Sequence, residues 1–298
     1  MSVKRAIVCL AVLLATGASA LAQYPVAPDL AVGLGLAIVD PAAQPAGANV
    51  HGCKSAVDPY PVVLVNGTFS VAKDDFGGMA PSLANAGYCV YTFNYGGNNP
   101  GDLIQAIRPV AQSAQALAAF VEQVKAATGA AKVDLVGHSQ GGMLSEYYTK
   151  VLGGAANVHS LVALSPTTHG TTLDGLSALA GFFPDAPEVV GSLCPACTDQ
   201  EAGSAVIAAL DAGPIAQPGI KYTIIETKNE IVVTPVGSSF IAEAGVVNEY
   251  VQQFCPLDVV GHASLPYDNV VIQLVKNALA PATALKPNCF KEFPFPTQ

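Results

Sequence analysis

The sequence predicts an α/β fold built on a mostly parallel central sheet that is flanked by helices. Short apolar runs alternate with longer segments of helical spacing, and this alternation is typical of parallel strands joined by helices. The apolar runs have few polar residues, as in strands buried on both faces of a sheet. They lie at 61–65, 88–93, 133–136, 158–164 and 222–226.

Three segments have the spacing of amphipathic helices. Residues 102–128 carry apolar side chains three and four positions apart, and Pro109 should mark an irregularity or a new start within them. Residues 141–152 and 268–279 are the other two predicted helices, and 246–254 is expected to form the last strand.

The chain of 298 residues is expected to form one domain over 23–298, because single α/β domains often exceed 200 residues. Residues 23–60 are rich in Pro, Gly and Ala and predict an extended arm, held by Cys53. Residues 171–221 show no strand pattern, so we expect a cap-like insertion between the strands near 164 and 222.

The first 22 residues have the order of a secretory signal peptide. Lys4 and Arg5 precede an apolar run over 6–15, and small residues follow up to Ala22. The run is shorter than the roughly 18 to 20 residues that span a bilayer, although a retained anchor is the alternative. This pattern predicts a mature protein that is extracellular or periplasmic and has no transmembrane anchor.

The amino-acid composition limits the kinds of molecule that the protein is expected to bind. Charged residues make up 12% of the chain and hydrophobic residues 51%, which is typical of a folded chain. The net charge of −9 comes without clusters of Lys and Arg, which argues against nucleic acid and anionic membranes as partners.

The number of cysteines agrees with the predicted secretion of the protein. Cys9 would leave with the signal peptide, and an even number in a secreted chain suggests disulfides, although six cysteines allow 15 pairings. The CPAC motif could be a redox pair, but it lies in the insertion instead of between a strand and a helix, which favours a structural bridge. The six remaining cysteines are Cys53, Cys89, Cys194, Cys197, Cys255 and Cys289.

The stretch VDLVGHSQGG, at 133–142, predicts a nucleophile elbow. A Gly-x-Ser-x-Gly motif alone is a weak signal in a chain with 28 glycines. Here a predicted strand precedes Ser139 and a predicted helix follows it, and small residues stand two places before and after it, as the elbow requires. Ser139 is therefore the candidate nucleophile, and it needs a histidine base and an orienting acid.

Chain order selects the base. In nucleophile-elbow enzymes the serine is followed by the acid and then by the histidine. His51 precedes the first strand, His138 adjoins the serine and points away, and His159 and His169 come before any acid. His262, in a loop ahead of the last helix, is the predicted base; a merely exposed loop histidine is the alternative.

The predicted acid is Glu230, which follows the strand at 222–226. Glu226 belongs to that strand, while Asp258 and Asp268 lie too near the histidine in sequence to be first choices. The alternative is that Glu230 is an exposed loop glutamate.

Two residues are predicted to stabilise the oxyanion. The backbone N–H of Gln140 lies at the start of the helix after the serine, and Thr68 lies in the turn Asn66-Gly67-Thr68 after the first strand. Asn66 also begins a glycosylation sequon, but a position at the end of a buried strand makes this match a false positive.

The insertion offers a candidate acyl site. Its apolar residues lie next to the expected mouth of the active site, although packing in the core is the alternative. They are Leu176, Leu179, Ala180, Phe182 and Phe183.

Seven segments together resemble the secreted class 2 triacylglycerol lipases of bacteria, a family of the α/β-hydrolase superfamily that is similar to yeast lipase B. The segments are PVVLVNGTF, GYCVYTFNYG, KVDLVGHSQGGM, VALSPTTHGTT, CPAC, EIVVTP and CPLDVVGH, within 53–289. The resemblance implies that the residues named above are nucleophile, base and oxyanion donors. It also implies the bridges Cys53–Cys89, Cys255–Cys289 and Cys194–Cys197.

The chain departs from the family pattern at two points. The family acid is an aspartate followed by Glu-Val-Val, whereas this chain has Glu230 followed by Ile-Val-Val. The first strand of the family ends in His-Gly, whereas this chain has Asn66-Gly67.

The sequence therefore predicts a secreted serine hydrolase of carboxylic esters, a lipase acting on an ester or lipid at a lipid–water interface. No metal or organic cofactor is indicated. The same machinery would serve an acyltransferase or a polyester depolymerase, because the pocket selects the acceptor. A non-catalytic binder on a hydrolase fold is a further alternative, but such a protein should lack a triad member.

Overall fold

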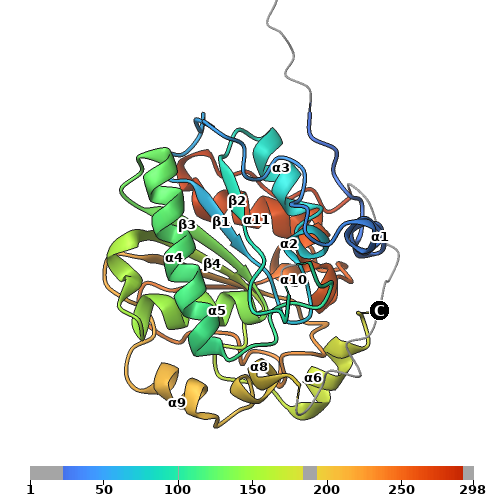
Figure 1. Cartoon of the computed structure of the whole chain (residues 1–298), viewed down its shortest axis with the longest axis vertical. Helices are drawn as coiled ribbons and strands as arrows, with labels where there is room; N and C mark the ends of the chain where they lie inside the picture. Colours follow the sequence, from blue (N-terminus) through green and yellow to red (C-terminus); the bar gives the residue numbers. More distant parts are fainter. Residues whose placement is uncertain (1–22, 100, 184–192, 291–298) are drawn as a thin grey trace, which may run out of the picture.

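The computed structural model describes residues 23–99, 101–183 and 193–290, and in these residues a six-stranded parallel sheet forms the centre of the molecule (Figure 1). The strand order is β2-β1-β3-β4-β5-β6, and every neighbouring pair is parallel. This confirms the predicted α/β architecture. The strands are β1 (Val62–Val65), β2 (Val90–Thr92), β3 (Val133–His138), β4 (Val158–Leu164), β5 (Lys221–Glu226) and β6 (Val247–Tyr250).

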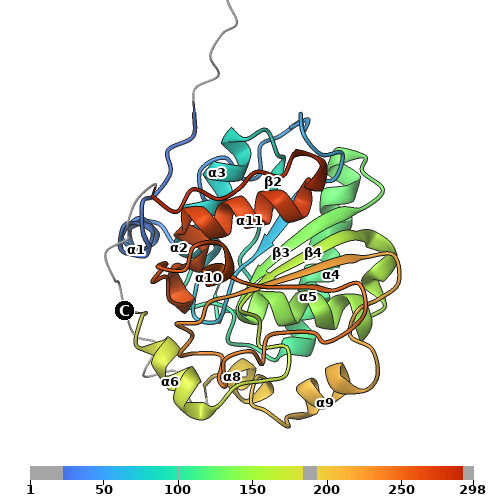
Figure 2. The same ribbon diagram turned by 180° about the vertical axis from the view of Figure 1, so that it is seen from behind.

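Helices cover both faces of the sheet. α4 (Val110–Thr128) and α5 (Gln140–Lys150) lie on one face, and α3 (Met79–Asn85) and α11 (Asn269–Leu279) lie on the other (Figures 1 and 2). Because side chains alternate along a strand, each strand serves two cores. Alternate residues of β1 thus belong to different apolar clusters.

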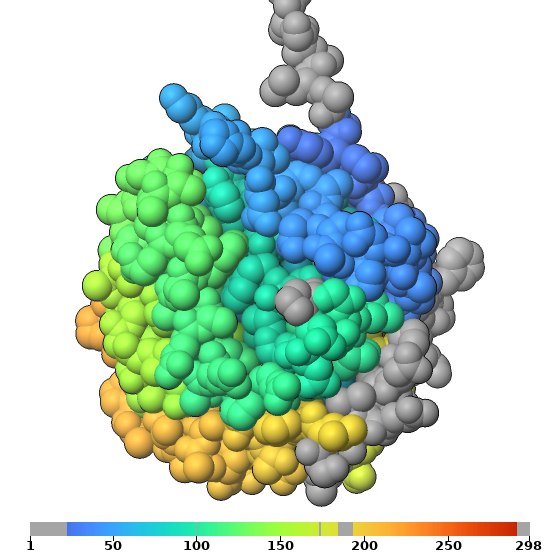
Figure 3. Space-filling model, viewed as in Figure 1, coloured from blue at the N-terminus to red at the C-terminus, as the bar shows by residue number. Residues whose placement is uncertain are grey.

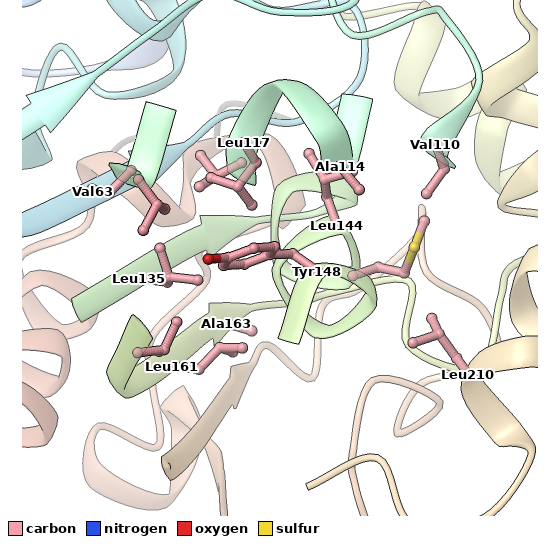
Figure 4. Close-up of a cluster of buried hydrophobic side chains, with 14 of the residues drawn as sticks. Val63, Val110, Ala114, Leu117, Leu135, Leu144, Tyr148, Leu161, Ala163 and Leu210 are labelled. Atoms are coloured by element: carbon pink, nitrogen blue, oxygen red, sulfur yellow. The ribbon is translucent and has the colours of Figure 1, made fainter. Parts of the chain in front are cut away.

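The core between the sheet and α4 and α5 is closely packed. Figure 4 shows Val63, Leu135 and Leu161 from three neighbouring strands facing side chains of both helices. Tyr148 of α5 lies among them and is almost fully buried. This packing fixes α5 against the sheet, and α5 begins directly after Ser139.

The remaining elements lie around the edges of the sheet. Two of them, α8 and α9, share one face of the molecule with the N-terminal arm and α4, as Figure 3 shows. These elements are α1 (Leu30–Val39), α2 (Ala72–Asp75), α6 (Leu173–Ala180), α8 (Pro195–Asp199), α9 (Ala205–Asp211), α10 (Val251–Phe254), η1 (Gly154–Asn157), η2 (His262–Tyr267) and η3 (Pro281–Thr283).

Three elements differ from the sequence-based expectations. The segment expected as one helix from 102 is helical only from Val110, because Pro109 has no N–H and takes an extended ψ of 136° at the N-cap. The last strand ends at Tyr250, where the chain turns into α10. The arm contains α1, which Asp29 caps by accepting a hydrogen bond from the N–H of Val32.

The three bridges implied by the resemblance are present: Cys53–Cys89, Cys194–Cys197 and Cys255–Cys289. The signal peptide expected over 1–22 lies outside the described residues. Within the described ranges, none of the helices has the length and apolar character needed to cross a membrane.

Candidate active site

Ser139 lies in a strained turn between β3 and α5. Its φ of 54° and ψ of −124° place it in a backbone region that residues other than glycine rarely adopt. A methyl group at Gly137 would overlap the backbone of Gly141, and one at Gly141 would overlap the carbonyl oxygen of Val65. The two glycines therefore permit the turn, and the turn sets the serine at the carboxyl end of β3.

His262 and Glu230 form a buried pair beside this turn. The Nδ1 atom of His262 lies 2.8 Å from Oε2 of Glu230, and both side chains are buried. Glu230 follows β5 and His262 begins η2, so two loops at the same end of the sheet meet here. The structure thus brings together the predicted base and the predicted acid.

The second oxygen of Glu230 fixes the orientation of the carboxylate. Oε1 accepts hydrogen bonds from the N–H groups of Val232, at 2.7 Å, and Val233, at 3.0 Å. Burial alone would raise the pKa of Glu230, but facing His262 and these N–H groups outweigh burial and hold the pKa below its ordinary value. Glu230 is therefore a charged partner for the imidazole.

The reactive ends of the serine and the histidine are not occupied by neighbouring groups. Ser139 Oγ and His262 Nε2 are buried, and neither makes a hydrogen bond within the described part of the chain. In a neutral imidazole whose Nδ1 donates to this carboxylate, Nε2 carries the lone pair and can accept a proton. His262 thus has the tautomer that a general base requires.

The predicted oxyanion residues also meet at Ser139. A methyl group at Gly67 would lie 3.1 Å from Cβ of Ser139, which places the loop after β1 directly beside the serine. The hydroxyl of Thr68 donates to Oε1 of Gln140 at 2.6 Å. Gln140 is the first residue of α5, where the backbone N–H groups are free of intrahelical partners and the helix dipole favours negative charge.

Gln200 is a member of this site that the sequence did not indicate. Its Nε2 donates to Oγ1 of Thr68, at 2.9 Å, and to Oε1 of Gln140, at 3.0 Å. Its Oε1 accepts from the hydroxyl of Thr167 at 3.1 Å, and the side chain is fully buried. Gln200 follows α8 in the insertion, and no motif around it signals this position.

Asn66 shapes the loop after β1. Its amide donates to the carbonyl oxygens of Ser70, at 2.7 Å, and Gly67, at 3.2 Å. Because the side chain is fully buried, the sequon that begins at Asn66 is not accessible in the folded protein.

The candidate acyl-site residues belong to a buried apolar cluster. Leu176, Leu179 and Phe183 are buried, and Phe182 packs against the cluster while partly exposed. The cluster also contains Phe69, next to Thr68, and Val232 and Val233, which bind Glu230. The insertion therefore packs under both loops that carry the site.

The fold and the serine turn define the class of protein: this is a protein of the α/β-hydrolase fold. Residues 59–275 match the sequence model of the family described as Lipase (class 2), and the chain belongs to this family.

Curated relatives agree with the family. The chain is 41% identical over 131 residues to triacylglycerol lipases of Pseudarthrobacter phenanthrenivorans and Burkholderia plantarii. Each match covers 42% of this chain but only 37% and 33% of the two relatives, so it spans about a third of their length. Among solved structures, Aspergillus fumigatus lipase B has a TM-score of 0.61 at 18% identity, covering 81% of this chain and 56% of that one, which supports the fold.

Proposed function

We propose that the protein is a secreted triacylglycerol lipase that hydrolyses carboxylic esters with Ser139, His262 and Glu230 through an acyl-enzyme. The observation that carries this proposal is the buried His262–Glu230 pair beside a serine held in a strained strand-to-helix turn. The class 2 lipase family supports an ester as the substrate.

In acylation, Ser139 Oγ attacks the ester carbonyl carbon while His262 Nε2 takes the proton of the Ser139 hydroxyl. Glu230, ionised and fixed by two backbone N–H groups, stabilises the imidazolium that forms. The imidazolium then gives its proton to the leaving alcohol, and the acyl group remains on Ser139. Water attacks this ester in the second half of the cycle, with His262 again acting as base.

The oxyanion accepts hydrogen bonds from the backbone N–H groups of Thr68 and Gln140 and from the Thr68 hydroxyl. This hydroxyl donates to Gln140 Oε1 in the free protein and has to turn toward the oxyanion. Gln200 Nε2 still donates to Gln140 Oε1 after that turn, so the acceptor keeps a partner. One such oxyanion donor contributes about 3 kcal/mol to the transition state in comparable sites.

The acyl chain would lie against Phe182, at the exposed edge of the cluster that also contains Leu176, Leu179 and Phe183. The partly exposed Phe182, at the edge of the cluster under the site loops, supports this assignment. Three disulfides in the described chain and the signal-like first 22 residues support secretion.

The proposal is tested by replacing Ser139 and a matched serine. Ser165 also has a positive φ, is buried, and has a hydroxyl that makes no hydrogen bond with any described residue, but it follows β4 instead of β3. Ser139→Ala should fold and lose triacylglycerol hydrolysis almost completely, whereas Ser165→Ala should stay active. Hydrolysis by folded Ser139→Ala at a tenth of the wild-type rate or more would rule out this mechanism.

A further inference from the structure

The geometry points to Asp75 and His138 as positioning residues that bridge the oxyanion loop and the base His262. Neither residue touches the reacting atoms in the proposed mechanism. The inference rests on the proposed function, because it assigns both side chains to the same reaction. It adds a second support to the base, beside the one that Glu230 provides.

Asp75 holds the oxyanion loop through one of its carboxylate oxygens. Oδ2 accepts a hydrogen bond from the backbone N–H of Gly67 at 2.7 Å. Gly67 precedes Thr68 and lies against Ser139, so this bond fixes the backbone from which the oxyanion donors project. Asp75 ends α2, the short helix that follows this loop, and is almost fully buried.

The other carboxylate oxygen of Asp75 binds His138. Oδ1 lies 2.7 Å from Nδ1 of His138, and the opposite ring nitrogen, Nε2, lies 3.1 Å from the backbone carbonyl oxygen of His262. The two imidazole rings are 5.0 Å apart between their centroids. A continuous chain of hydrogen bonds thus runs from Gly67 through Asp75 and His138 to His262.

The partners of His138 decide its protonation state. A carboxylate and a carbonyl oxygen are both acceptors, so the ring satisfies both only when each nitrogen carries a proton. Burial alone would lower the pKa of His138, but Asp75 and the two hydrogen bonds hold the pKa above its ordinary value. The buried, hydrogen-bonded pair of His138 and Asp75 therefore has a geometry suited to a rigid link.

This link fixes the part of His262 that Glu230 leaves free. Glu230 holds the ring at Nδ1, whereas His138 holds the backbone carbonyl of the same residue. With the backbone and one ring atom both held, the position of Nε2 relative to Ser139 is set. A displacement of about 1 Å in such a group can lower the rate roughly a hundredfold.

Amide substitutions separate the two arms of the bridge. Asparagine at 138 can place an N–H near the position of Nδ1 and keep the bond to Asp75, while it loses the bond to His262. Glutamine at 138 can reach the position of Nε2 and keep the bond to His262, while it loses the bond to Asp75. Both variants avoid the cavity that alanine would leave.

The readout is the ratio of kcat/KM for two esters with the same acyl group. An alkyl alkoxide needs a proton from the imidazolium to leave, whereas a nitrophenolate leaves without one. A displaced base therefore lowers kcat/KM for the alkyl ester more than kcat/KM for the nitrophenyl ester. A loosened oxyanion loop lowers the two kcat/KM values by a similar factor. Loss of folded protein also lowers both alike, and titration with a fluorophosphonate corrects for it.

His138→Asn should lower the alkyl-ester value roughly tenfold or more beyond any loss on the nitrophenyl ester. His138→Gln should lower both values by a similar factor. His159→Asn is the matched control, because His159 also binds a buried aspartate, Asp134 at 2.9 Å, but lies at the opposite end of the sheet. The control should leave the ratio unchanged.

A second pair of variants applies if His138→Asn does not fold. Asp75→Asn can accept from Gly67 and donate to a neutral His138, so it should keep both kcat/KM values near wild type, whereas Asp75→Ala frees the oxyanion loop and should lower both values by a similar factor. An unchanged ratio in folded His138→Asn, or wild-type kcat/KM values in folded Asp75→Ala, would overturn the bridge. Activity retained in Ser139→Ala would instead overturn the proposed function, so the two failures are distinguishable.

Discussion

The Nδ1 atom of His262 lies 2.8 Å from Oε2 of Glu230 although glutamate is one methylene longer than the family's aspartate. The longer side chain fits because the carboxylate of Glu230 folds back toward the loop that follows it. Its other oxygen accepts from the N–H groups two and three residues further along, at Val232 and Val233. The loop thus holds the longer acid at hydrogen-bonding distance from the histidine.

Replacing Glu230 tests this arrangement. Glu230→Gln should keep the shape but remove the charge that stabilises the imidazolium, and turnover should fall by up to about 10⁴. Glu230→Asp should retain only part of the activity. The shorter aspartate keeps the charge but can reach the ring only if the loop moves. Steady-state kinetics that show near-normal Glu230→Gln and inactive Asp258→Asn or Asp268→Asn would move the acid elsewhere.

Gln200 should support the oxyanion donors without touching substrate. Gln200→Leu removes the amide that donates to Thr68 and Gln140. We expect kcat to fall roughly ten- to a hundredfold with little change in KM, because the lost hydrogen bonds hold groups that stabilise the transition state more than the bound substrate. Gln217→Leu is the control, because Gln217 is partly exposed and its side-chain amide donates to the nearby carbonyl oxygens of Pro214 and Ile215. Equal kinetics in the two variants would show that Gln200 is only structural.

The pH dependence of stability should report Glu146. Burial raises the pKa of Glu146 to about 8 from 4.5 in the unfolded chain. Between these two pKa values the folded protein keeps a proton that the unfolded chain has released. The contribution of protonated Glu146 to the free energy of unfolding is therefore full below about pH 4.5 and is lost as the pH rises to about 8. Over that window it lowers the free energy of unfolding by about 1.4 kcal/mol per pH unit.

Glu146→Gln should remove this slope, which urea unfolding at several pH values can measure. The hydrogen bond from Thr168 to Oε1 can persist in the amide. Glu122→Gln, at an exposed glutamate of α4, should leave the slope unchanged. Parallel curves for wild type and Glu146→Gln would show that Glu146 is ionised in the folded protein.

Replacing each of the two phenylalanines that follow α6 should have a different effect on activity and stability. Phe182 is partly exposed, whereas Phe183 is buried in the cluster under the site loops. Phe182→Ala should change the ratio of activities on long and short esters with little loss of stability. Phe183→Ala should change the ratio and also lower the melting temperature. An unchanged ratio in both variants would leave these residues with a packing role alone.

The sequence predicted the parts of the molecule that depend on local patterns. The strand at 158–164 and the turn at Ser139 depend on short apolar runs and on small residues at fixed spacing, and both are present. His262 followed from chain order, and the structure sets it beside Glu230.

The sequence could not predict features that depend on distant contacts. Gln200 reaches the site only because the insertion folds back, 60 residues after Gln140. The position of His138 beside the serine predicts only that its side chain points away from the reacting atoms, and that orientation joins it to Asp75 and to the backbone of His262. Neither contact leaves a pattern in the neighbouring residues.

Labelling with a fluorophosphonate, followed by peptide mass mapping, tests the central claim most directly. The reagent reacts with a serine only where a base and oxyanion donors activate it. We expect one adduct per chain, on Ser139, that is lost after heat denaturation and in Ser139→Ala but kept in Ser165→Ala. An adduct on another residue, or no adduct on folded protein that hydrolyses esters, would contradict the assignment of Ser139 as the nucleophile.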